Sequence, residues 1–175
     1  MKVICISAKA QHGKDTAAEI IKEYAEQKQQ RVLIIHYADL LKFICTKFFG
    51  WDGVKDDRGR TILQHVGTDT VRTYNPNYWV DFVITFLKMF EADWDLVLIP
   101  DCRFPNEATR MVENFDTRVL RVVRPGFDNG LSAEQLKHAS ETAMDDFAFD
   151  TVIYNDSTLE AFKEKLLQFV DTVLV

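Results

Sequence analysis

The sequence lacks the features of a secreted or membrane-spanning protein. It holds three cysteines, Cys5, Cys45 and Cys102, which are odd in number and far apart. This usage predicts reduced thiols in a cytoplasmic protein rather than a disulfide framework or a zinc site. No apolar run reaches membrane-spanning length, and the N-terminus goes directly into a strand pattern, so no membrane span and no signal peptide are expected.

Basic charge is also scarce. The chain has 21 Lys and Arg against 27 Asp and Glu, a formal net charge of -6. This balance argues against a nucleic-acid coat or an anionic-membrane binder, although a small anionic substrate can still bind in a local basic pocket. No repeat, low-complexity stretch or linker is evident, so the 175 residues are expected to form a single domain.

Short apolar runs alternate with helical patterns along the chain. The expected strands are 2–7, 31–37, 95–100, 118–124 and 150–155. The expected helices are 14–27, 39–49, 61–74, 77–92, 106–114 and 158–173. Residues 50–60 predict a loop, and the polar residues 125–141 a mobile segment. The alternation predicts an α/β fold with a mostly parallel five-stranded sheet and helices on both faces.

In such sheets, ligands bind beyond the carboxyl ends of the strands. The functional residues are therefore expected directly after the strands. These positions are Ala8 to Thr16, Asp39, Asp101 to Arg103, Arg124, and Asn155 to Ser157.

The stretch "ISAKAQHGKDTAAEII" joins the first strand to the first helix, which is the context of a phosphate-binding loop. The usual pattern is G-x-x-x-x-G-K-[ST], but here Ala8 replaces the first glycine and Asp15 the hydroxyl. Gly13 permits close backbone approach, and Lys14 can reach terminal phosphates at a helix start that favours anions. A carboxylate at Asp15 is a better magnesium ligand than a hydroxyl, and Thr16 offers a hydroxyl one place later.

A plainer interpretation of the same stretch stays open. Gly-Lys-Asp-Thr can be an ordinary helix N-terminus in which Asp15 or Thr16 serves as a cap.

Five blocks of the sequence resemble, in the same order, those of the bacteriophage-type deoxynucleoside monophosphate kinases, within the adenylate-kinase-like P-loop kinases. The blocks are "HGKDTAAEII", "YADLLK", "GRTILQHVGTDTVRTYNPNYWVD", "DCRFPNEA" and "HASETAMDDFAFDTVIYNDSTLEAFKEKL". The most specific is "DCRFPNEA", which is similar to D-x-R-F-P-N-E. The departures are Ala8 in the loop and Leu40, which stands in place of a proline.

The resemblance implies a three-layer P-loop kinase fold that transfers the γ-phosphate of ATP, with Mg²⁺, to a deoxynucleoside monophosphate. It implies an acceptor-binding region at about 40–90 and a lid-like segment at about 125–145. Relatives form dimers, which makes a homodimer possible, and a phage-encoded chain would act in the host cytoplasm. The bases that are accepted stay open.

The resemblance also implies roles for individual residues. The catalytic set is Lys14, Arg103 and Arg124, and the metal ligand is Asp15. The ATP-binding set is Gln11, His12, Gly13, Lys14, Asp15, Thr16, Asn155 and Ser157. The acceptor-binding set is Asp39, Lys42, Arg72, Trp79, Asp101 and Arg103.

Several of these residues have structural alternatives. By composition, Trp79 favours the core over a stacking platform. Arg72 can be a solvated helix residue paired with Asp69, and Glu107 and Glu141 can orient arginines. For His12 the backbone is expected to matter more than the ring.

Two other functions stay open at this point. One is another small-molecule kinase of this fold, such as a dephospho-coenzyme A kinase. The other is a nucleotide-binding regulatory module without turnover.

Overall fold

The structure, a computed structural model, describes residues 1–174. The chain forms two compact units: residues 1–35 together with those from 90 onward, and residues 36–89. The prediction of a single domain stays a prediction.

Within the described residues, no helix combines the length and the apolar character needed to cross a bilayer. Cys5, Cys45 and Cys102 are buried thiols that form no disulfide within the described residues.

The larger unit contains a five-stranded sheet in the order β2-β3-β1-β4-β5, in which every neighbouring pair is parallel. The strands are β1 (Lys2–Ala8), β2 (Val32–Ile34), β3 (Leu96–Ile99), β4 (Asp116–Val123) and β5 (Thr151–Tyr154). This confirms the predicted parallel sheet.

The second strand is shorter than the predicted 31–37. At its start, the Arg31 backbone N–H and guanidinium both donate to the Asp95 carboxylate. At its end, the His36 N–H donates to Asp39 and the chain turns into the next helix. Side-chain carboxylates therefore accept the N–H groups of Arg31 and His36, although backbone hydrogen bonds from Leu96 to Arg31 and from Ile35 to Leu98 continue just past the strand.

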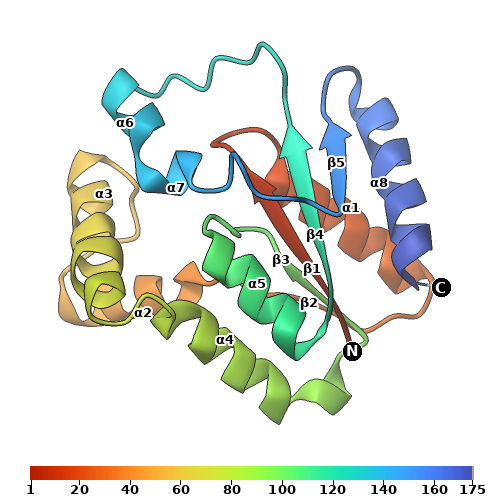
Figure 1. Ribbon diagram of the computed structural model, residues 1–175, viewed down its shortest axis with the longest axis horizontal. Helices are drawn as coiled ribbons and strands as arrows, with labels where there is room; N and C mark the ends of the chain where they lie inside the picture. Colours follow the sequence, from red (N-terminus) through yellow and green to blue (C-terminus); the bar gives the residue numbers. More distant parts are fainter. Residues whose placement is uncertain (175) are drawn as a thin grey trace. The chain divides into compact units, whose positions relative to one another are not determined.

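Helices cover both faces of this sheet, as predicted (Figure 1). Alternate residues of β1, Ile4 and Ile6, pack in one core with α1 (Lys14–Gln27) and α8 (Leu159–Leu174). The opposite face carries α5 (Pro105–Asn114), which is tied to β4 where the Thr117 hydroxyl donates to the Met111 carbonyl. The remaining elements of this unit are η2 (Glu91–Asp93), α6 (Ala133–Lys137) and α7 (Ala139–Thr142).

The smaller unit consists of α2 (Ala38–Phe48), α3 (Asp57–Gln64), the π-helix η1 (His65–Arg72) and α4 (Tyr78–Met89). The predicted loop over 50–60 is wrong from Asp57 onward, because a helix begins there. The Asp56 carboxylate caps it by accepting the Gly59 N–H at 2.7 Å. Gly59 is buried under the Trp51 indole, where a Cβ would lie 2.7 Å from Nε1.

The predicted helix 61–74 is divided at Gln64, where α3 passes into η1. In η1, Gly67 lies against Leu41, whose Cδ2 would be only 2.6 Å from an added Cβ. Tertiary packing of this kind is absent from the 3.6-residue pattern, so the change of helix type could not be read from that pattern.

Candidate functional site

The phosphate-loop candidate joins β1 to α1 through two left-handed residues, Gln11 at φ 60° and Gly13 at φ 103°. Gly13 is the N-cap of α1. Ala8 ends β1 and is not among the positive-φ residues. Alanine is strained only at positive φ, so replacing the usual first glycine costs this loop no backbone strain.

No side chain caps the N-terminus of α1 within residues 1–174. The cap interpretation of Asp15 and Thr16 is therefore not what the structure shows. The N–H groups of this first turn keep their affinity for an anion. Asp15 has a 69% exposed side chain and accepts from Lys14 Nζ at 2.5 Å.

Asn155, which follows β5, supports the loop from the side. Its Nδ2 donates to the His12 carbonyl at 3.2 Å and would lie 3.0 Å from a Cβ on Gly13. Glycine is thus required at position 13, because a side chain there would be strained at this positive φ and crowded by Asn155. Ser157 is exposed.

The His12 ring takes a larger part than expected, because its Nδ1 accepts the Arg124 N–H at 3.1 Å. Burial lowers the pKa of His12, and the positive charges of Arg121 and Lys9 lower it further. The Arg124 guanidinium stacks on the Phe127 ring at 3.9 Å. The ring of His12 therefore connects the loop to the beginning of the predicted lid.

Arg103 is held from two sides. Its N–H donates to the buried Glu107 carboxylate at 2.7 Å. Its Nη1 donates to Glu141 Oε1 at 2.5 Å and to the Ser140 carbonyl at 3.0 Å. Glu107 therefore orients the backbone of Arg103, and Glu141 orients its guanidinium. Both acids thus orient an arginine, which is the structural alternative to a direct role in the site.

Arg121 is a further residue of this site, and it is not among the residues predicted from the sequence. It is buried within β4, where Nη1 donates to Ser7 Oγ at 2.8 Å and Nη2 to Asp145 at 3.1 Å. Burial lowers the pKa of Arg121, while the Asp145 and Glu141 carboxylates oppose that shift. The available signal was an arginine in the middle of the apolar run "RVLRVVR", since a buried charge needs a partner.

Cations therefore gather where the adjacent strands β3, β1 and β4 end. They are Lys9, Lys14, Arg103, Arg121 and Arg124. Asp101 follows β3 at the same edge and is half-buried. These five cations lie where a polyphosphate binds in a parallel α/β sheet, and the carboxylates of Asp15, Glu141 and Asp145 pair with four of them.

The smaller unit carries the other predicted acceptor residues. Asp39 accepts from the His36 N–H at 2.8 Å and from Lys42 Nζ at 3.2 Å. Burial alone would raise the pKa of Asp39, but the His36 N–H and the charges of His36 and Lys42 lower it overall. Arg72 ends η1 and is half-buried.

Trp79 is 2% exposed, and its indole N–H donates to the Gly67 carbonyl at 3.1 Å. A ring this buried presents no face on which a base can stack. Trp79 is therefore a core residue, as the composition favoured, and not a stacking platform.

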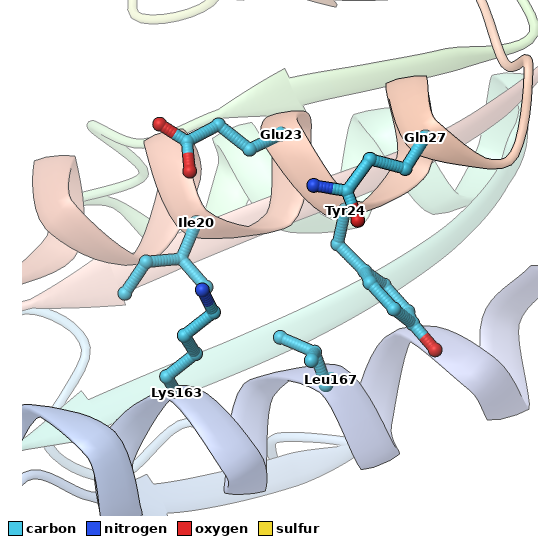
Figure 2. Close-up of a pocket in the computed structure, with 6 residues that line it drawn as sticks. All are labelled: Ile20, Glu23, Tyr24, Gln27, Lys163 and Leu167. Atoms are coloured by element: carbon cyan, nitrogen blue, oxygen red, sulfur yellow. The ribbon is translucent and has the colours of Figure 1, made fainter.

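A separate hollow lies between α1 and α8 (Figure 2). Its lining residues are Ile20, Glu23, Tyr24, Gln27, Lys163 and Leu167. The first four come from the middle and carboxyl-terminal part of α1, away from the helix start at Lys14, and the last two come from α8. This hollow is therefore not part of the phosphate-loop site.

Within residues 1–174, no three His, Cys, Asp or Glu side chains group as a metal cage. Magnesium does not need one, since it usually keeps several waters and binds through one or two carboxylates together with substrate phosphates. The exposed Asp15 carboxylate at the loop fits that donor set.

A family model described as deoxynucleotide monophosphate kinase matches residues 55–166. The chain is 32% identical over 139 residues to the uncharacterized protein ORF77 of Ictalurid herpesvirus 1 (strain Auburn), covering 78% of this chain and 58% of that protein. It is 30% identical over 109 residues to the deoxynucleotide monophosphate kinase of Enterobacteria phage T4, covering 61% of this chain and 43% of that protein. The chain spans about half the length of these two relatives.

A solved structure shares the fold. The APS kinase CysC of Mycobacterium tuberculosis in complex with AMPPNP and APS matches with a TM-score of 0.58 at 10% identity. The match covers 99% of this chain and 98% of that one. At this identity the likeness concerns the fold alone, and it agrees with the predicted P-loop kinase architecture.

Proposed function

Because this chain belongs to the deoxynucleotide monophosphate kinase family, we propose that it transfers the γ-phosphate of ATP to a deoxynucleoside 5′-monophosphate, producing the diphosphate and ADP. The observation that carries this proposal is the loop before α1. It combines an uncapped helix N-terminus, Gly13 in the left-handed region and Lys14 at the first helical position.

In the proposed donor site, the N–H groups of residues 11–16 surround the β- and γ-phosphates, with Gln11, His12 and Thr16 contributing through the backbone. Lys14 neutralises charge where the phosphates crowd together. Asn155 holds the loop through the His12 carbonyl, and Ser157 stays a candidate for the adenine side. Asp15 is the proposed ligand of Mg²⁺, which when bound neutralises phosphate charge.

In the proposed acceptor site, Arg103 binds the phosphate of the monophosphate, because a guanidinium can grip phosphate through two parallel hydrogen bonds. An oxygen of that phosphate forms a bond to the γ-phosphorus, while the bond from that phosphorus to the bridging oxygen of ADP breaks. The nucleophile is already an anion, so the protein supplies alignment and charge rather than a strong base. Arg124 acts on the transferred group when the segment after β4 closes.

Asp39, Lys42, Arg72 and Asp101 stay candidates for acceptor binding on the sequence resemblance. Trp79 is left out because of its burial. A homodimer and a cytoplasmic location, in the host if the chain is phage-encoded, also stay proposals.

The test is release of ADP with magnesium, ATP and a panel of acceptors: dGMP, dCMP, dTMP, dAMP, the matching ribonucleotides and dephospho-coenzyme A. The expected result is turnover with deoxynucleotides, at higher kcat/KM than with GMP or CMP, and its loss in Lys14→Ala. Turnover only with dephospho-coenzyme A would assign the other kinase function. ATP binding without any product would assign a regulatory module.

A further inference from the structure

The segment from Ala139 to Asp145 places two carboxylates, four residues apart, against the strand-end cluster. Glu141 joins the phosphate loop to Arg103: Oε2 accepts the Ala10 N–H at 2.9 Å and Oε1 accepts Arg103 Nη1 at 2.5 Å. Asp145 joins the same loop to Arg121: Oδ2 accepts Lys9 Nζ and Oδ1 accepts Arg121 Nη2, both at 3.1 Å. Each acid therefore bridges a loop donor and an arginine.

The two bridges differ in strength. The Glu141 side chain is 8% exposed, whereas that of Asp145 is 39% exposed. Water and salt screen the Asp145 pairs, while the Glu141 carboxylate lies in a medium of lower dielectric, where its hydrogen bonds are stronger. Removing its charge also weakens a charge-assisted hydrogen bond to the partly buried Arg103 guanidinium. Glu141 is therefore the bridge with the larger expected effect.

The direction of the Glu141 contact matters for the chemistry. Both hydrogen bonds that the Arg103 guanidinium makes within residues 1–174 use Nη1, to Glu141 and Ser140. Because the guanidinium is planar, holding Nη1 fixes the direction of Nη2 and Nε. A guanidinium fixed in this way can bind an anion without a further loss of side-chain conformational entropy.

We propose that Glu141 is a positioning residue that holds Arg103 in one orientation relative to the phosphate loop. This proposal rests on the proposed function. Asp145 provides a second, weaker bridge to the same loop. Through these two acids, docking of the segment that contains α7 aligns the arginines with the loop. Glu141 itself does not contact the reacting atoms.

The first test needs neither nucleotide nor turnover. Amide hydrogen exchange at Ala10 is measured in the wild type, in Glu141→Gln and in the matched control Glu134→Gln, an exposed acid in α6. Loss of a charged hydrogen bond predicts roughly ten- to a hundredfold faster exchange at Ala10 in Glu141→Gln, and no change in the control. Unchanged exchange in Glu141→Gln overturns the bridge, whether or not the protein is a kinase.

The second test separates positioning from a general structural role. If Glu141 acts through Arg103, kcat falls roughly tenfold or more in Glu141→Gln, while KM for ATP stays near its wild-type value. The same substitution in an Arg103→Lys background then adds little, because the two residues act as one unit. Independent, multiplying effects in the double variant overturn the positioning role.

Folding is checked by the thermal midpoint of each variant. If Glu141→Gln fails to fold, Asp145→Asn carries the test: it removes the charge that holds the Lys9 side chain, and faster exchange is expected at the neighbouring Ala10 amide because the segment is held less firmly against the loop. In that variant, unchanged exchange at Ala10 and an unchanged kcat overturn the proposal. A wild type that lacks turnover rejects the proposed function, and the exchange measurements still decide whether Glu141 joins the loop to its surroundings.

Discussion

The Nδ1 of His12 accepts a hydrogen bond from the backbone N–H of Arg124, at 3.1 Å. The contact joins the phosphate loop to the end of β4, and it requires Nδ1 to carry no proton. Burial, reinforced by Arg121 and Lys9, lowers the pKa of His12 and so favours this neutral ring.

The lowered pKa predicts a pH dependence of stability. In the unfolded chain His12 takes up a proton near its ordinary pKa of about 6.5, whereas the folded chain resists protonation until lower pH. The free energy of unfolding should therefore be highest above that range and fall as the pH drops from about 6.5 toward the folded pKa. Urea unfolding at several pH values measures this fall.

The matched variant is His12→Asn, which keeps an acceptor but does not titrate. Its free energy of unfolding should depend less on pH below about 6.5 than that of the wild type. Equal pH profiles for the two proteins would show that His12 is not the source of the pH dependence of stability.

Ala8→Gly restores the usual first glycine of the loop. Because Ala8 lies in β1 without a positive φ, we expect no gain in ATP affinity. The added chain entropy of glycine in a strand should cost about 0.5–1 kcal/mol of unfolding free energy. ATP titration and urea unfolding check both parts, and tighter ATP binding would show that the loop is distorted by Ala8.

Asp15→Asn tests the proposed metal ligand. Asn keeps the size of the side chain but coordinates magnesium less well, so the magnesium concentration for half-maximal rate should rise, and excess magnesium should restore part of the rate. Stability should change little, since no side chain caps α1 and the Asp15 side chain is largely exposed. An unchanged magnesium requirement would transfer the assignment to Thr16.

Arg103→Lys keeps the charge but loses the planar fork that Glu141 and Ser140 hold. The kcat/KM for the acceptor monophosphate should fall roughly ten- to a thousandfold, from about 1.5–4 kcal/mol of lost hydrogen bonding and alignment. ATP affinity should stay close to that of the wild type. Wild-type kinetics in this variant would place Arg103 outside the site.

The sequence alone determined the sheet and the position of the loop. Apolar runs such as "KVICIS" and "DLVLIP" are short, rich in β-branched residues and apolar on both faces, which is the pattern of buried parallel strands. The order of strand, glycine, lysine and helix places Lys14 at the strand end, because parallel strands bring their carboxyl ends to one edge. These are local patterns, and the structure retains them.

Only the tertiary structure decided which side chains pair. Arg121 and Asp145 are 24 residues apart and meet because β4 and the segment after α7 lie side by side in the larger unit. Trp79 can be fully buried in the core because its indole N–H, which would otherwise lose its partner in water, donates to the carbonyl of Gly67. Such partners depend on distances through space between residues that are remote in sequence, and no periodicity of a single segment encodes them.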